Sequence, residues 1–242
     1  MSGHSKWHNI QKTKGAADAK KAKIFTKYAR EMAIAIKEGG SADPNSNSKL
    51  AAVIARAKSE NVPNDNIKRT LDKYKSGAAA ENYEYAAYEG YGPGGIAVIV
   101  ETLTDNKNRT VAEVRHYLDK YGKGMGASGC VSWQFSKKGF IAIDGEDLDE
   151  ETVMMQALEA GASDFQVEAG VFEIYTEPDD FDTVKENLQK EGFTFLEAEV
   201  QMIPQTYTAL TNEEDIKNME KMLEVMEEND DIQDVWHNWE QE

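Results

Sequence analysis

The sequence predicts an α+β protein: an N-terminal three-helix domain followed by two ferredoxin-like α+β domains, one inserted in the other. Three observations lead to this prediction. Apolar residues recur at helical spacing up to residue 77, the pattern then changes to β-β-α-β, and residues 137–202 follow the order β-α-β-β-α-β. We therefore expect domains at 1–77, at 78–135 together with 206–242, and at 136–205.

The length and composition suit a globular intracellular protein. The 242 residues, 40% of them hydrophobic, are enough for two or three compact cores. No apolar run approaches the ~18 residues of a membrane span, and no apolar signal-peptide core follows the N-terminus. The single cysteine, Cys130, leaves no partner for a disulfide within the chain, as expected in a reducing compartment. We expect a cytoplasmic protein that does not act at a membrane.

Residues 15–38 are predicted to form the first helix of the N-terminal domain. Gly39-Gly40 supplies the expected stop. At helical spacing, the basic residues of this segment lie on the side of the helix opposite its apolar face. The apolar face consists of Phe25, Tyr28, Ala29, Met32 and Ile36.

Two further helices complete the predicted bundle. The second follows the polar run 45–48, buries Leu50, Val53, Ile54 and Ala57, and ends near 61–63. The third is predicted to have Asn64 as its N-cap and to end at Gly77. Its inward positions are Ile67, Leu71 and Tyr74.

The next segment is predicted to begin with a β-hairpin. Residues 83–91 and 96–103 read as strands, and Gly92-Pro93-Gly94-Gly95 is the turn between them. The spacing of Thr110 and Glu113 fits a capping box that opens a helix reaching Tyr121, and a strand is expected at 130–135.

The inserted domain is predicted from a complete β-α-β-β-α-β series. Its expected elements are strand 140–143, helix 150–160, strands 165–168 and 171–175, helix 180–191 and strand 195–202. After residue 206 only one helix and a strand at 235–239 remain, which cannot bury a core alone. We expect them to complete the β-β-α-β segment.

The charge is distributed very unevenly along the chain. The formal net charge is −17, yet residues 1–77 hold 16 Lys and Arg against 7 Asp and Glu, and the remainder holds 11 against 37. Because phosphate contacts depend on cations, the basic segment predicts nucleic-acid binding. The predicted contact residues are Lys6, Trp7, Lys12, Lys14, Lys20, Lys23, Lys27, Arg30, Lys37, Arg56, Lys58, Lys68 and Arg69.

A glycine-rich segment, residues 124–129, matches the pattern G-x-G-x-x-G. It follows a predicted helix and precedes a predicted strand, whereas a dinucleotide-binding loop has the reverse order. We interpret it as a tight helix-to-strand turn. The alternative, an enzyme that binds a nucleotide there, would require ATP, GTP or NAD to bind near this turn.

No catalytic residue, metal site or cofactor is predicted. His4 and His8 are four residues apart but have no third ligand nearby. Neither His116 nor His237 is accompanied by a serine or cysteine motif that would supply a nucleophile. We therefore expect a binding protein and not an enzyme.

Five separated blocks closely resemble the YebC/PmpR family, and the resemblance runs from end to end. The blocks are Gly3 to Trp7, Lys23 to Lys27, Asp65-Asn66-Ile67, Tyr88 to Gly95 and Thr104 to Thr110. The resemblance implies a three-domain α+β protein with an N-terminal three-helix domain. Members are described as probable transcriptional regulators that bind promoter DNA, while mitochondrial and bacterial relatives act as translational activators at the ribosome.

Two positions depart from the family pattern. Ser48-Lys49 stands where the family usually has Pro-Arg, and Gly124 stands where asparagine is expected. The first change keeps the positive charge. The second leaves the role of the glycine-rich turn open.

Two functions follow from these observations. The leading hypothesis is a transcriptional regulator whose basic N-terminal domain binds DNA while the acidic domains contact a protein partner or limit non-specific binding. The alternative is a ribosome-associated translation factor whose same basic helices bind structured ribosomal RNA. No recognition helix with an obvious set of base-reading side chains stands out, and charge alone does not separate the two.

Overall fold

The computed structural model describes residues 17–76 and 82–240, with side chains from Lys23 onward. It shows the expected mixed α+β architecture, three N-terminal helices followed by two sheets with helices. The chain folds into two compact units. One contains the helical bundle and the first sheet, and the other contains the second sheet. The three-domain division at 1–77, 78–135 with 206–242, and 136–205 stays a prediction.

The N-terminal bundle consists of α2 (Ala17–Gly39), α3 (Ser48–Ser59) and α4 (Asn64–Lys75). Asn47 caps α3 by accepting the N–H of Leu50, as the polar run before this helix predicts. The predicted cap at Asn64 is wrong: Asn64 is the first residue of α4, and Pro63 precedes it without a side-chain cap. The bundle core includes Met32, Leu50, Ala57 and Ile67 and is flanked by Phe25, Leu71 and Tyr74.

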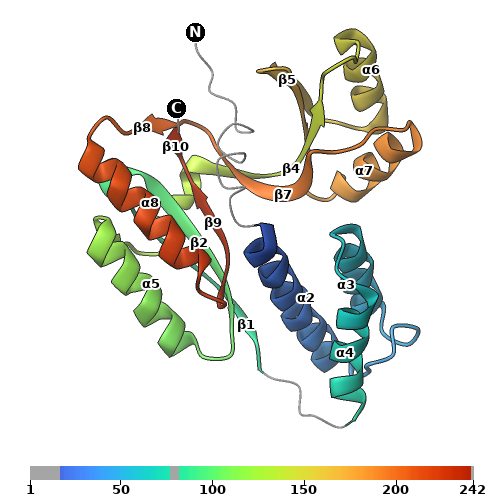
Figure 1. The fold of residues 1–242 in the computed structure, drawn as a ribbon, viewed down its shortest axis with the longest axis horizontal. Helices are drawn as coiled ribbons and strands as arrows, with labels where there is room; N and C mark the ends of the chain where they lie inside the picture. The colour runs from blue at the N-terminus through green and yellow to red at the C-terminus, as the bar shows by residue number, and fades with distance from the viewer. Residues whose placement is uncertain (1–16, 77–81, 241–242) are drawn as a thin grey trace. The chain divides into compact units, whose positions relative to one another are not determined.

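The first sheet has the strand order β3-β1-β2-β9. The predicted hairpin is confirmed as β1 (Glu84–Tyr91) and β2 (Ala97–Thr104), paired antiparallel. The helices α5 (Lys107–Tyr121) and α8 (Glu213–Glu227) lie side by side on one face (Figure 1). The sheet is completed by β3 (Gly124–Met125) and β9 (Ile232–His237).

This strand order is that of a ferredoxin-like sheet in which β1 has been moved to the start of the chain. In the β-α-β-β-α-β series, β2 takes the position of the first strand, β3 the second, β1 the third and β9 the fourth. The helices α5 and α8 take the positions of the two helices. The late helix and strand therefore complete the earlier β-β-α-β segment, as expected. Their buried methionines, Met219, Met222 and Met226, belong to α8.

The start of α5 differs from the prediction. The helix begins at Lys107, one turn before Thr110, because the side-chain oxygen of Asn106 accepts the N–H of Arg109 at 3.1 Å. Thr110 is fully buried inside the helix and does not cap it.

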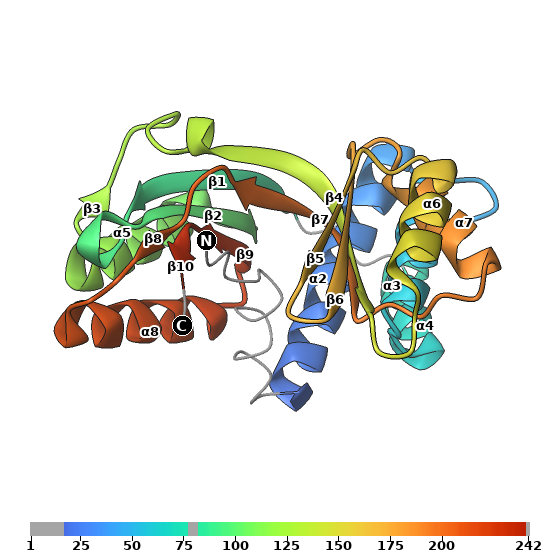
Figure 2. The ribbon, with the colours of Figure 1, turned by 90° about the horizontal axis from the view of Figure 1, so that it is seen from above.

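The second sheet has the order β5-β6-β4-β7 with all neighbours antiparallel, the ferredoxin-like arrangement. The helices α6 (Glu150–Ala160) and α7 (Phe181–Lys190) cover one face of it (Figure 2). The strands are β4 (Phe135–Asp144), β5 (Asp164–Glu168), β6 (Val171–Thr176) and β7 (Glu197–Pro204).

The strand predicted at 130–135 is wrong. Residues Ser132–Gln134 form a 3-10 helix, and a single ten-residue strand, β4, runs from Phe135 through the segment 140–143. Lys137 and Lys138 interrupt the apolar pattern in mid-strand, yet both pair with β7 through their backbones. The short strands β8 (Thr208–Ala209) and β10 (Trp239–Glu240) pair with each other in parallel.

The structure leaves no room for a side chain at Gly90 of β1. A Cβ atom there would lie 2.6 Å from the carbonyl oxygen of Gly124 and 3.0 Å from Leu118. We expect Gly90→Ala to lower the free energy of unfolding by about 1–3 kcal/mol in urea titrations, because β1 and β3 must separate. Ala87→Ser, at an exposed position of the same strand, serves as the control, and equal stability of the two variants would contradict this account.

Candidate nucleic-acid interface

The predicted contact residues divide into three groups in the structure. Five of them, Lys6, Trp7, Lys12, Lys14 and Lys20, lie outside the described residues or have undescribed side chains. The second group forms hydrogen bonds or ion pairs with other parts of the same unit, and its members are Lys23, Lys27, Arg30, Lys37 and Arg56. The third is exposed to solvent.

Three cations of α2 are engaged by the end of α8 and the start of β9. Lys23 donates to the carbonyl oxygen of Glu227 (3.3 Å), and Lys27 forms an ion pair with Asp234 (2.9 Å). Burial lowers the pKa of Lys23 below its ordinary value, partly offset by the negative charges of Asp234 and Glu227.

Arg30 is the most deeply held of these cations, with 13% of its side chain exposed. Its guanidinium donates to the carbonyl oxygens of Leu103 (2.6 Å) and Asp230 (2.7 Å) and to the carboxylate of Asp231 (3.0 Å). It also lies over the ring of Tyr83, 5.1 Å from the centroid. A guanidinium with this many protein acceptors is already satisfied without a phosphate.

Asp231 is the shared acceptor of this region. Its buried carboxylate binds Arg30 of α2 through one oxygen, and through the other it binds Arg109 together with the hydroxyls of Thr104 and Thr110. Burial, the largest single influence, would raise the pKa of Asp231, but the hydrogen bonds from Arg109, Thr110 and Thr104 hold it below its ordinary value. The carboxylate therefore remains charged and ties α2 to β2, α5 and β9.

Two other predicted residues have partners within the bundle region. Lys37 donates to Asn82 (2.7 Å), and Arg56 pairs with the buried carboxylate of Glu31 (2.8 Å). Arg56 remains half exposed. Lys49, at the position where the family usually has arginine, pairs with Glu38.

Lys58, Lys68 and Arg69 are exposed, and within the described residues they form no hydrogen bond or ion pair. The turn at 60–63 joins the end of α3 to the start of α4 and is closed by the bond from the Val62 N–H to the Ala57 carbonyl (2.9 Å). This short turn joins the helix that carries Lys58 to the helix that carries Lys68 and Arg69. The structure thus leaves three predicted cations exposed on the consecutive helices α3 and α4.

Lys75 of α4 is exposed in the same way and was not among the predicted contacts. It lies in the last turn of α4, where a cation interacts favourably with the helix dipole. The same helix exposes Asp65 and Asp72, so the α4 surface is basic only on balance.

The glycine-rich segment uses its backbone for pairing within the sheet. The N–H of Lys123 donates to Tyr91 (2.7 Å), and the N–H of Gly126 donates to Glu89 (2.8 Å). Gly124 and Gly129 have φ values of 102° and 87°, which favour glycine. The interpretation of residues 124–129 as a helix-to-strand turn is wrong at both ends, because Gly124 and Met125 form the strand β3 and no strand begins at residue 130. The amide of Gly126 is bonded to β1 and is not free to bind a phosphate.

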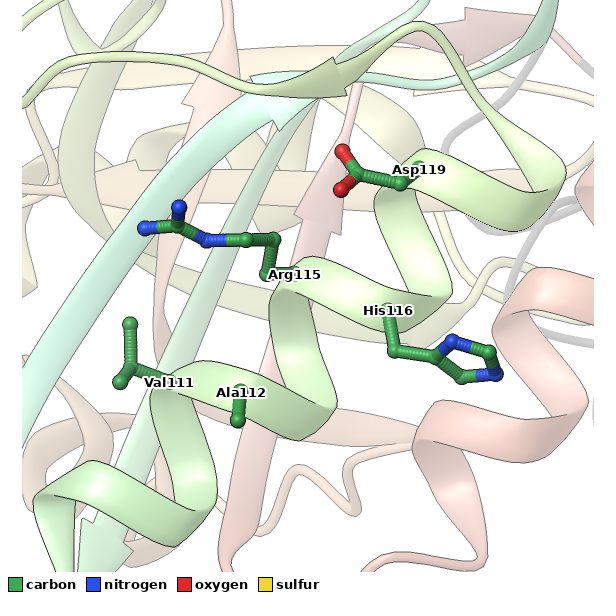
Figure 3. Close-up of a pocket in the computed structure, with 5 residues that line it drawn as sticks. All are labelled: Val111, Ala112, Arg115, His116 and Asp119. Carbon is green, nitrogen blue, oxygen red and sulfur yellow. The ribbon is translucent and has the colours of Figure 1, made fainter.

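A shallow depression runs along the outer side of α5. Its lining residues all come from that helix, and Figure 3 shows Arg115 and His116 extending from it in different directions. It adds an exposed cation, Arg115, on the first sheet. Sequence reasoning missed this residue, because an exposed arginine on an amphipathic helix of mixed charge is ordinary.

His4 and His8 lie outside the described residues, and the two histidines with described side chains, His116 and His237, differ in their surroundings. The Nδ1 atom of His237 accepts the N–H of Trp239 (3.3 Å), and burial lowers the pKa of His237 to about 4, so its ring is neutral at pH 7. Within residues 17–76 and 82–240 no group of three or more His, Cys, Asp or Glu side chains could hold a metal ion. In the same ranges, no helix has the length and apolarity needed to cross a bilayer.

Two family models match the sequence, the TACO1/YebC protein N-terminal domain over residues 5–77 and the TACO1/YebC second and third domain over residues 83–239. The chain belongs to the TACO1/YebC family. A relative from Ruminiclostridium cellulolyticum, named a probable transcriptional regulatory protein, is 55% identical over 100% of this chain and 98% of its own length. One from Acetivibrio thermocellus with the same name is 53% identical over 99% of each.

The fold is shared with a solved structure. The crystal structure of a conserved hypothetical protein from Aquifex aeolicus matches with a TM-score of 0.74 and 40% identity, covering 92% of this chain and 91% of that one. The relatives' names place this chain in a family of regulatory proteins.

Asp231→Asn should destabilise the unit that contains the bundle and the first sheet. Losing the charge leaves Arg30 and Arg109 without their shared carboxylate, and we expect a loss of about 3 kcal/mol in urea unfolding at pH 7. Because the folded pKa of Asp231 is lowered, its stabilisation is present above the unfolded pKa of about 3.9 and is lost as the pH falls through the folded value.

The difference between wild type and variant should therefore shrink below about pH 4. Asp230→Asn is the matched control, because the exposed side chain of Asp230 forms no hydrogen bond or ion pair with the described residues. A constant difference from pH 7 to acid would show that the charge of Asp231 is not what stabilises the region.

Proposed function

We propose that this chain regulates transcription by binding DNA through the exposed cations of α3 and α4 in its N-terminal bundle. The observation that carries the proposal is that Lys58, Lys68 and Arg69 are exposed on α3 and α4 and form no hydrogen bond or ion pair within the described residues. They belong to a segment with 16 basic against 7 acidic residues. The family's regulatory names supply the biological context.

The proposed contacts are to phosphates. Exposed Lys and Arg on α3 and α4 are separated by Asp65 and Asp72, and no row of amide or arginine side chains suited to reading base edges is present on α4, which is described over its whole length. Binding through such cations depends strongly on salt, because each phosphate contact releases counterions. The acidic remainder of the chain limits non-specific attachment by repelling the polyanion.

Lys23, Lys27 and Arg30 are not part of the proposed DNA-binding surface. These cations already have acceptors in α8, β9 and β2, so contact with DNA would require them to exchange protein carboxylates and carbonyls for phosphates. Such an exchange offsets most of the electrostatic gain. We further propose that the protein acts in the cytoplasm by binding and not by catalysis, with no cofactor.

Structured RNA presents the same phosphate charge, so the alternative of a ribosome-associated translation factor would use the same three cations. The RNA alternative predicts preference for a ribosomal RNA fragment over a DNA duplex in direct competition. DNA regulation predicts the reverse.

Charge reversal at Lys58, Lys68 and Arg69 together should weaken binding to a mixed-sequence DNA duplex. If all three contact phosphates, the slope of log affinity against log salt should fall by about 2 to 3 units in fluorescence anisotropy titrations. The control is reversal at Lys123, Lys137 and Lys217, which are also exposed and give the same change in net charge.

Equal weakening in the two triple variants would contradict the proposed surface, because the effect would then come from net charge alone. A ribosomal RNA fragment measured in parallel decides between the two nucleic acids: tight RNA binding with no DNA binding would overturn the transcriptional function while keeping the surface.

A further inference from the structure

The outer face of α6 in the second sheet's unit is unusually apolar. The helix packs on the sheet through Val153 and Ala157, which are almost fully buried. On its other side Met154 is 36% exposed, Met155 59% and Leu158 51%. Single exposed apolar residues are normal on protein surfaces, but three on one helix of three turns form a patch.

Helix geometry places these three side chains on one arc that points away from α7. At about 100° per residue, Met154, Leu158 and Met155 lie roughly 100°, 140° and 200° from Val153. Gln156, at roughly 300°, donates to Glu191 beside α7 (3.4 Å). The methionine side therefore lies away from α7, toward β5.

The apolar surface continues at the edge of the sheet. Among the described residues β5 is an edge strand, paired only with β6. Its Val167 is 42% exposed and lies on the helix-covered face, since its cross-strand partner Phe172 belongs to the core there. Leu148, 41% exposed, lies in the loop that the Gly145 N–H ties to Gly170 of the β5–β6 turn (2.9 Å).

The charge around this surface has a single sign. Residues 144–168 contain nine Asp and Glu and no Lys or Arg. On α6 itself Glu151 falls within the apolar arc, and Glu150 and Glu159 lie at its borders. A surface of this kind repels an acidic partner and attracts a basic one, while the exposed thioethers adapt to varied apolar shapes.

We propose that the α6 patch, defined as Leu148, Met154, Met155, Leu158 and Val167, binds a basic amphipathic helix of another protein. The apolar side chains of that helix would pack on Met154, Met155 and Leu158, and its Lys and Arg would lie over Glu151 and Glu159. A second copy of this chain fits poorly, because most of its surface is acidic and Lys23, Lys27 and Arg30 of its basic helix α2 already have acceptors in their own unit. The proposal does not depend on DNA binding.

The test uses the full-length protein and two synthetic helical peptides that share one leucine face, one with lysine and one with glutamate at its polar positions. We expect the lysine peptide to bind in a salt-dependent manner and the glutamate peptide not to bind. Replacing Met154, Met155 and Leu158 by serine should weaken the lysine peptide about tenfold or more in anisotropy titrations. Leu196→Ser, an exposed apolar residue next to β7 at the opposite edge of the sheet, is the matched control.

A second variant separates charge from apolar contact. Glu151→Lys with Glu159→Lys leaves the three apolar residues in place and should weaken binding of the lysine peptide while the variant still unfolds in one cooperative thermal transition. Equal binding of the two peptides, or no effect of the triple serine variant, would overturn the proposal. Self-association in sedimentation that the triple variant abolishes would also overturn it, in favour of a second copy.

Discussion

The buried carboxylate of Asp231 is the interaction on which the arrangement of the helical bundle depends. A buried charge is tolerated only when it is fully paired, and this one has two arginines and two threonine hydroxyls as donors. The donors come from α2, β2 and α5, and the carboxylate itself precedes β9. Removing any of these partners would leave an incompletely paired charge in a poorly solvated site. The need to pair the Asp231 carboxylate therefore holds α2, β2, α5 and β9 together.

The acceptors around Asp231 also limit which cations of α2 are free to bind a phosphate. Lys23, Lys27 and Arg30 line one side of α2, and a chain this acidic offers them carboxylates and carbonyls at short range. The intramolecular acceptors are held in place by the fold, whereas a phosphate must come from solution and displace acceptors that these cations already have. The cations at the end of α3 and on α4 have no such acceptors among the described residues, which is why they carry the proposed function.

The second sheet's unit shows the opposite balance. Its α6 exposes methionine and leucine within a segment that carries only negative side-chain charges. The physical features that exclude nucleic acid from this surface are the ones that suit a basic protein helix. Taken together, the two proposed surfaces, cationic on one unit and acidic and apolar on the other, would connect a nucleic acid to a protein partner.

Local sequence patterns determined most of the secondary structure. Helical periodicity located α2, α3, α6 and α7 to within about two residues, and the glycine-proline turn located the β1–β2 hairpin, because these signals act between near neighbours in the chain. The β-α-β-β-α-β order was enough to predict the second sheet, since few topologies fit it. The unequal charge of the two parts of the chain was likewise readable without a structure.

Tertiary structure alone decided the rest. Thr110 looked like a helix cap from its spacing to Glu113, but Asn106 caps α5 one turn earlier. The Thr110 hydroxyl instead donates to Asp231, more than a hundred residues later in the chain. Lys137 and Lys138 interrupt the apolar pattern of β4, so the pattern did not predict one continuous strand. Backbone pairing with β7 keeps these residues in the strand. The separation of engaged from exposed cations also depends on acceptors that are distant in sequence. Such contacts leave no local trace, because they depend on which segments the fold brings together.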